Sequence, residues 1–135
     1  MVINQDGSQT LPISAMLTVG EEIIELEVAS TPEQQAIGLM FRTAMAPNHG
    51  MAFNFPEARP VSFWMKNTLI PLDMLFVHQG EIRAIKANVP PCENDPCPSY
   101  SSGAFVDQVI ELNAGRAEEL GLAPGQMLNL AYLQP

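Results

Sequence analysis

The chain has 135 residues, the length of one ordinary domain, and 47% of them are hydrophobic, which is enough to build a core and excludes an intrinsically disordered chain. Six Lys and Arg against 15 Asp and Glu give a net charge of −9, which argues against a nucleic-acid-binding surface because phosphate contacts need clustered cations. No apolar run approaches the roughly 20 residues of a membrane-spanning helix. The polar start predicts a flexible leader over residues 1–11 and a single β-rich domain over residues 12–135.

The first elements of this domain carry clear local signals. Residues 13–28 predict a β-hairpin, because apolar side chains alternate with polar ones at the period of a half-buried strand. Gly20-Glu21 fits its two-residue turn. The run Thr31-Pro-Glu-Gln34 predicts a helix start, with Thr31 as N-cap, proline at the first helical position and Gln34 completing a capping box. Gly38 keeps this helix short.

The rest of the chain alternates short strands with turn signals, among them Gln79-Gly80. A second short helix is predicted over residues 114–120, capped by Asn113 and ended by Gly121. Six more strands are predicted, over residues 50–55, 61–67, 72–77, 81–87, 105–112 and 127–133. The spacing predicts a mainly β fold, a small β-sandwich or barrel with two short α-helices, rather than repeated βαβ units.

Two cysteines, Cys92 and Cys97, lie in a proline-rich loop. They predict a disulfide, which would imply an oxidising, extracytoplasmic compartment. Free thiols and a metal site are the alternatives. With no histidine nearby the pair makes half a zinc site at best, and the spacing is not that of a C-x-x-C redox motif.

The strand Ser62-Phe-Trp-Met-Lys66 suggests a binding site. Successive side chains point to opposite faces, and Lys is almost never buried alone, so Phe63 and Met65 are predicted to face the core while Trp64 stands beside Lys66 on the other face. An indole next to a cation, with Asn67 following, is a typical way to hold a planar or sugar-like ligand. The alternative is a purely structural contact between the indole and the lysine stem.

Two carboxylates interrupt apolar strands. Asp73 lies in Ile70–Val77 and must be paired, with Lys66 or Arg42 as the expected partners; it is either structural or part of the site near Trp64. Glu111 lies in Val109–Leu112. Together Asp73 and Glu111 resemble the acid and base of a glycosidase, provided that both face one cleft.

Residues that could bind a soft metal ion also lie close together in the sequence, at Met40, Met45, His49 and Met51. Thioethers with one imidazole can hold Cu(I), but methionine is also a routine core residue, and the core interpretation is favoured at these spacings. We predict no metal and no cofactor. The sequence has no phosphate-binding glycine loop and no recognisable hydrolase motif.

Several strings together resemble one known family, "domain of unknown function 192", over residues 13–133. They are Gly38-Leu-Met-Phe-Arg42, Gly50-Met-Ala-Phe53, Phe63-Trp-Met-Lys-Asn-Thr-Leu-Ile-Pro-Leu-Asp73, Cys92 with Cys97-Pro-Ser-Tyr100, and Glu111-Leu-Asn-Ala-Gly115. The resemblance implies a mostly β, sandwich-like domain that is often exported, and it supplies no activity. Its matching polar residues are Arg42, Trp64, Lys66, Asn67, Asp73 and Glu111. Ala52 stands where larger apolar residues are common in the family.

The sequence therefore favours an extracytoplasmic module that binds a small polar, sugar-like or anionic molecule, rather than an enzyme. The predicted pocket is lined by Trp64, Lys66 and Asn67, with Asp73 and Arg42 orienting or neutralising. Two alternatives are an envelope saccharide hydrolase using Asp73 and Glu111, and a protein-interaction domain presenting the 100–103 loop and the proline-rich disulfide loop.

Overall fold

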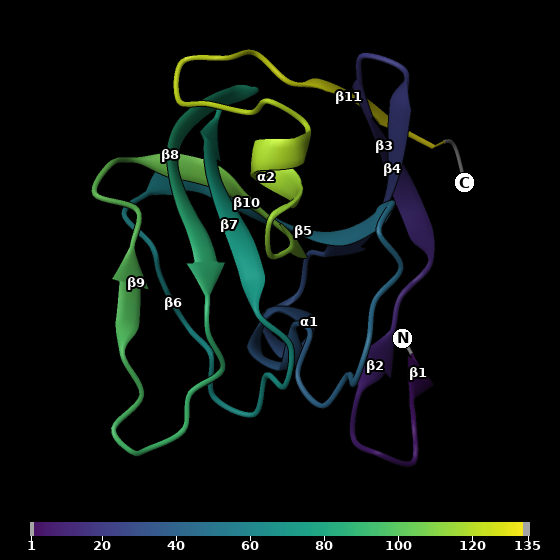
Figure 1. The fold of residues 1–135 in the computed structure, drawn as a ribbon, viewed down its shortest axis with the longest axis vertical. Helices are drawn as coiled ribbons and strands as arrows, with labels where there is room; N and C mark the ends of the chain where they lie inside the picture. The colour runs from purple at the N-terminus through teal and green to yellow at the C-terminus, as the bar shows by residue number, and fades with distance from the viewer. Residues whose placement is uncertain (1, 134–135) are drawn as a thin grey trace.

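The computed structural model describes residues 2–133 and is mainly β, with two short helices, as the sequence predicts. Its main sheet has seven strands in the order β11-β3-β4-β5-β10-β7-β8 (Figure 1). Their bounds are β3 (Ile13–Val19), β4 (Glu22–Ala29), β5 (His49–Arg59), β7 (Leu72–His78), β8 (Glu81–Val89), β10 (Val106–Asn113) and β11 (Asn129–Tyr132). All neighbours pair antiparallel except β4 and β5, which are parallel.

Two small hairpins and two helices complete the described chain. Strand β1 (Val2–Ile3) pairs with β2 (Gln9–Thr10), and β6 (Ser62–Trp64) pairs with β9 (Ser99–Ser101). Helix α1 (Pro32–Ile37) connects the parallel strands β4 and β5, and α2 (Arg116–Glu119) follows β10. The short β9 had no counterpart in the sequence prediction, because its three residues carry no alternation.

Local signals place the first elements correctly. The predicted hairpin over residues 13–28 is confirmed as β3 and β4, with Gly20 at a φ of +60° in the turn. The predicted capping box is confirmed at α1. The Thr31 hydroxyl accepts a hydrogen bond from the Gln34 amide, and the Gln34 side chain accepts one from the Thr31 amide in return. Gly38 follows the helix at a φ of +50°.

The N-terminal segment predicted as a flexible leader forms the β1–β2 hairpin. The buried Gln9 side chain anchors it, donating hydrogen bonds of 2.8 and 3.0 Å to the carbonyl groups of Gln34 and Gly38 at the end of α1. The next residue but one, Leu11, is buried in the core. This docking depends on contacts with residues about 25 to 29 positions away, which a local hydrophobicity pattern does not encode.

The second predicted cap is wrong. Helix α2 has no side-chain cap from its own N-terminal residues, and Asn113 instead donates to the Met45 carbonyl at 2.7 Å. The acceptor at this helix start is Asp73 of β7, which receives hydrogen bonds from the amides of Gly115 and Ala117. A distant strand therefore supplies the cap that the local sequence does not.

Apolar clusters cover both faces of the main sheet. One face carries Met51, Phe53, Met74, Phe76 and Val109, and the segments around α1 and β6 pack on it. The opposite face carries Ala52, Leu75, Val77, Ile110 and Leu112, and it packs against Ala117 of α2. We call these the α1 face and the α2 face.

No helix within residues 2–133 combines the length and the apolar character needed to cross a membrane.

Candidate functional site

A pocket of about 460 Å³ opens on the α1 face. Helix α1 and the residues after it form one wall, and the outer part of β5 with β6 forms the other. Four aromatic residues line it: Phe53, Phe55, Phe63 and Trp64. Its polar lining consists of Gln35, Arg59, Ser62, Thr68 and Glu111. The volume lies in the range of small-molecule sites in proteins.

Glu111 supplies a carboxyl group in the buried part of this pocket. It lies in the middle of β10, opposite Met51 of β5 and Met74 of β7, and only 4% of the residue is exposed. No hydrogen bond or ion pair from residues 2–133 stabilises its charged form, so burial raises the pKa of Glu111 to about 8. At neutral pH the side chain is mainly a neutral acid. A buried, unpaired carboxyl group that lines a pocket is the typical mark of a functional site.

The strand predicted over residues 61–67 is shorter in the structure, because β6 ends at Trp64 and Lys66 lies in the turn that follows. Phe63 packs against the core with its ring at 4.9 Å and 87° from that of Phe53. Met65 is buried, whereas Trp64 is 51% exposed at the pocket. The Lys66 ammonium lies 5.3 Å from the centre of the indole ring. The indole and the ammonium therefore lie together on the outer side, although only Trp64 lines the pocket.

Asn67 plays a backbone role. Its φ is +58°, a left-handed conformation that Asn tolerates better than most residues. Its carbonyl accepts a hydrogen bond from the amide of Phe41, at 2.8 Å, which ties the turn after β6 to the segment after α1. Neither Lys66 nor Asn67 lines the pocket.

Arg42 is held by a different carboxylate from the one the sequence suggested. Its guanidinium donates to Glu27 and to the Gln9 carbonyl, both at 2.8 Å, and Glu27 also contacts His49 and accepts from the Leu11 amide. Burial alone would raise the pKa of Glu27, but the hydrogen bonds from His49 and Arg42 outweigh it and lower this pKa to about 2. Arg42 is thus part of a structural network and does not line the pocket.

Asp73 is fully buried and lies outside the pocket. It accepts hydrogen bonds from the amides of Asn88, Gly115 and Ala117 at 2.8, 3.1 and 2.9 Å. These three donors account for a carboxylate in an apolar strand. The predicted partners Lys66 and Arg42 are wrong, because backbone amides take their place.

The prediction that Asp73 and Glu111 face one cleft is also wrong. Asp73 pairs with Leu112, whereas Glu111 pairs with Met74. Because successive side chains alternate between faces, Asp73 points to the α2 face and Glu111 to the α1 face. Two carboxyl groups on opposite sides of a packed sheet cannot act on one glycosidic bond, so the hydrolase hypothesis is discarded.

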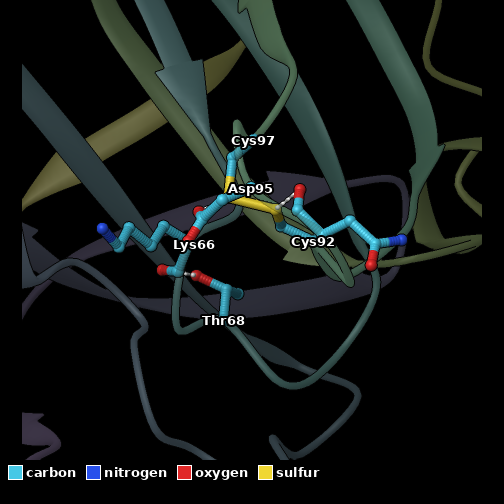
Figure 2. The surroundings of a disulfide bond; sticks show 6 residues. Lys66, Thr68, Cys92, Asp95 and Cys97 are labelled. Atoms are coloured by element: carbon cyan, nitrogen blue, oxygen red, sulfur yellow. Dashed lines mark hydrogen bonds between the residues drawn. A yellow bond between two sulfur atoms is a disulfide. The ribbon is translucent and has the colours of Figure 1, made fainter.

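The predicted disulfide is present. Cys92 and Cys97 are joined, with their Cα atoms 5.6 Å apart, and Figure 2 shows Lys66 and Thr68 in the surroundings of the bridge. Beside this loop, residues 99–101 pair with β6, and the Ser102 amide donates to the Val61 carbonyl. The 100–103 segment is therefore integrated into the fold.

The methionine and histidine cluster does not form an accessible site. Met51 is fully buried, and Nε2 of His49 contacts Glu27 at 2.5 Å. Met40 lines the pocket, while Met45 packs against the core. Within the described part of the chain, no group of three or more His, Cys, Asp and Glu side chains is arranged to hold a metal ion.

Sequence reasoning therefore found two members of the pocket, Trp64 and Glu111, and missed the rest. The missed lining includes Phe53, Phe55 and Arg59, whose guanidinium lies 4.9 Å from the centre of the Phe55 ring. The closely spaced aromatics of Phe53-Asn-Phe55 were the available signal, but aromatic residues in a strand are more often core.

Comparison with known proteins identifies similar proteins of known structure. A crystal structure from Sinorhizobium meliloti 1021, described as a candidate transcription regulator, has a TM-score of 0.76 and 41% identity over 88% of this chain and 92% of that one. A protein of unknown function from Novosphingobium aromaticivorans DSM 12444 has a TM-score of 0.78 and 32% identity, over 96% and 91% of the two chains. None of the curated proteins compared with the chain matches it.

The family DUF192, "Uncharacterized ACR", matches residues 15–130, which include every strand of the main sheet except the first two residues of β3 and the last two of β11. The pocket and its Glu111 lie inside this range. The chain therefore belongs to the DUF192 family.

Proposed function

We propose that this protein is a binding module for a small amphipathic molecule, whose apolar body contacts the aromatic residues of the pocket and whose polar group reaches Glu111. The observation that carries the proposal is the buried carboxyl group of Glu111, which lines the pocket and has no partner among residues 2–133. We assign no reaction to the site.

The energetics of Glu111 support a ligand. Within residues 2–133 the one enclosed side-chain atom without a hydrogen-bond partner is Oε1 of Gln9, so the Glu111 oxygens still reach the pocket. Withdrawing most of the Glu111 carboxyl group from water without a protein partner nonetheless costs free energy. Its strand neighbours Met51 and Met74 are apolar and cannot relieve this cost. A ligand atom that pairs with the carboxyl group would.

The pocket also has a polarity gradient that favours an amphipathic ligand. Glu111 lies in the buried part, aromatic rings form the walls, and the exposed Arg59 lies at the outer part. A sugar would find few polar partners here, since the lining offers only Gln35, Ser62 and Thr68 besides the two charged residues. An apolar body with a polar end matches the lining better.

We further propose that the protein works outside the cytoplasm. The Cys92–Cys97 bridge supports this assignment, because disulfides persist mainly in oxidising compartments. We do not transfer the description of the Sinorhizobium meliloti relative as a transcription regulator to this chain, because a net charge of −9 and only six Lys and Arg residues do not favour nucleic-acid binding.

Two variants of α1 test the binding proposal. Ala36 lines the pocket, whereas Glu33 of the same helix is exposed outside it. We would titrate the protein with phenylalkyl amines, alcohols and carboxylates and follow binding by NMR and by the fluorescence of Trp64, the single tryptophan. Ala36→Phe should weaken binding about tenfold or more, a loss of ~1.4 kcal/mol, and Glu33→Phe should leave it unchanged.

Trp64→Ala should likewise weaken binding while costing little stability, because half of this side chain is already in solvent. The proposal fails if none of the three probe classes binds saturably, or if Ala36→Phe and Glu33→Phe bind equally well.

A further inference from the structure

We propose that the ligand presents one basic nitrogen to the Glu111 carboxyl group, and that binding expels the carboxyl proton to solvent. This inference rests on the proposed function and narrows it to a class of ligand, an apolar monoamine whose far end is neutral or anionic. The proton balance is simple: the neutral carboxyl group and the ligand's ammonium ion form a carboxylate–ammonium pair, and one proton leaves to the buffer.

The walls of the pocket favour a cation over an anion beside Glu111. Aromatic faces carry negative potential and attract ammonium groups, an effect that grows when the cation is desolvated. Both cation–π contacts found within residues 2–133 flank this pocket, Arg59 on Phe55 and Lys66 on Trp64. The deeper rings of Phe53 and Phe63 contact each other edge to face and have no such cation. A ligand ammonium beside Glu111 would be near these rings.

No cation from residues 2–133 takes this place. Among the lining residues, Arg59 is the only other charged side chain, and it is exposed at the outer part of the pocket. From α1, the lining contributes uncharged residues, with Gln35 as its polar member. In the turn after β6, Lys66 lies with its ammonium 5.3 Å from the centre of the Trp64 ring, on the outer side. Glu111 is thus the single acidic side chain of the pocket.

The charged groups on the neighbouring strands do not pair with Glu111 either. On β4, Glu27 lies on the same face, beyond Met51, where it forms an ion pair with Arg42 and a hydrogen bond with His49 of β5. On β7, Asp73 points to the opposite face. On β8, Lys86 pairs in register with Met74 and is exposed. Burial therefore keeps Glu111 protonated in the free protein, with its pKa raised to about 8, and a ligand cation would reverse this preference.

The exposed cations restrict the charge that the other end of the ligand can carry. Arg59 and Lys66 both lie around the outer part of the pocket, so a second ammonium there would be repelled. A neutral or anionic group would be tolerated or attracted. Diamines and longer polyamines are therefore predicted to bind more weakly than monoamines with the same apolar body.

Calorimetry with matched probes tests the inference. The probes are 3-phenylpropylamine, 3-phenylpropan-1-ol and 3-phenylpropionate, titrated at neutral pH in phosphate and in Tris, whose ionisation enthalpies differ. The amine should bind most tightly and release most of one proton per site, because a group with a pKa of about 8 is mainly protonated at pH 7. The alcohol should release none.

Glu111→Gln should abolish the proton release and weaken amine binding about tenfold or more, while the alcohol changes less than about twofold. Glu33→Gln, the same change at an exposed acid of α1 outside the pocket, should retain the proton release. Wild-type protein gives a second test that does not depend on the fold of a variant. Between pH 6 and pH 8, amine affinity should rise about tenfold or more as Glu111 loses its proton, with no matching rise for the alcohol.

Amine and alcohol of equal affinity, or amine binding without proton release, would overturn the amine assignment and leave the binding proposal standing. Failure of all three probes to bind would refute the binding proposal itself, and the amine assignment with it.

Discussion

Replacing Glu111 with Gln should make this protein more stable at high pH and remove much of its pH dependence. The carboxyl group is raised from an ordinary pKa of 4.5 to about 8 in the folded state. The folded protein therefore holds a proton that the unfolded chain has released between these two values. The free energy of unfolding must fall as the pH rises through this window, because ionising the buried group is more costly than ionising it in the unfolded chain.

The magnitude follows from the two pKa values. Each unit of pKa difference corresponds to about 1.4 kcal/mol, so Glu111 lowers the free energy of unfolding by roughly 3–4 kcal/mol between pH 5 and pH 8. Other titrating groups contribute as well, but wild type and Glu111→Gln share them. The difference between the two stability curves therefore isolates Glu111.

Urea unfolding followed by Trp64 fluorescence and circular dichroism at several pH values measures this difference. Wild type should lose stability relative to Glu111→Gln steadily across the window, whereas Glu57→Gln, a change of an exposed acid on β5, should run parallel to wild type. Parallel curves for wild type and Glu111→Gln would refute the reasoning, since they would mean that Glu111 ionises as freely in the folded protein as in the unfolded chain.

Two further predictions concern the structural carboxylates. Asp73→Ala should destabilise the protein by about 3 kcal/mol or more, because one buried and two partly buried backbone amides lose their acceptor. Asp107→Ala, which removes the acceptor of an exposed hydrogen bond from the Gln79 amide, should cost less than about 1 kcal/mol by the same urea assay. The pKa of Glu27 is lowered from an ordinary 4.5 to about 2. Its stabilising contribution is therefore present above pH 4.5 and is lost as the pH falls toward 2. Acid titration by circular dichroism should therefore show a weaker pH dependence in this range for Glu27→Gln than for wild type, and an unchanged acid transition would contradict the network of Glu27 with Arg42 and His49.

Local patterns in the sequence were sufficient for most of the fold. The hairpin of β3 and β4 and the start of α1 depend on side chains that lie within a few residues of one another, at the periods of a strand and of a helical capping box. The pairing of Cys92 with Cys97 was predictable for the same reason, since a short loop keeps the two residues close. The outward position of Trp64 followed from the pleat of β6, whereas Lys66 lies beside the indole from the turn after this strand.

Tertiary structure decided the partners and the site. The sequence marked Asp73 and Glu111 as buried acids, and only the register of β7 against β10 placed them on opposite faces of the sheet. A shift of that register by one residue would have put both on the same face. The cap of α2 and the partner of Arg42 likewise come from strands far away in the chain.

The sequence by itself thus determined which short segments become strands and helices, because those preferences arise between near neighbours. Which acid is paired and which is left alone in a pocket was decided by the packing of distant strands. A residue's pKa and accessibility depend on everything that surrounds it in space, and the surroundings of Glu111 come from α1, β5, β6 and β7 together.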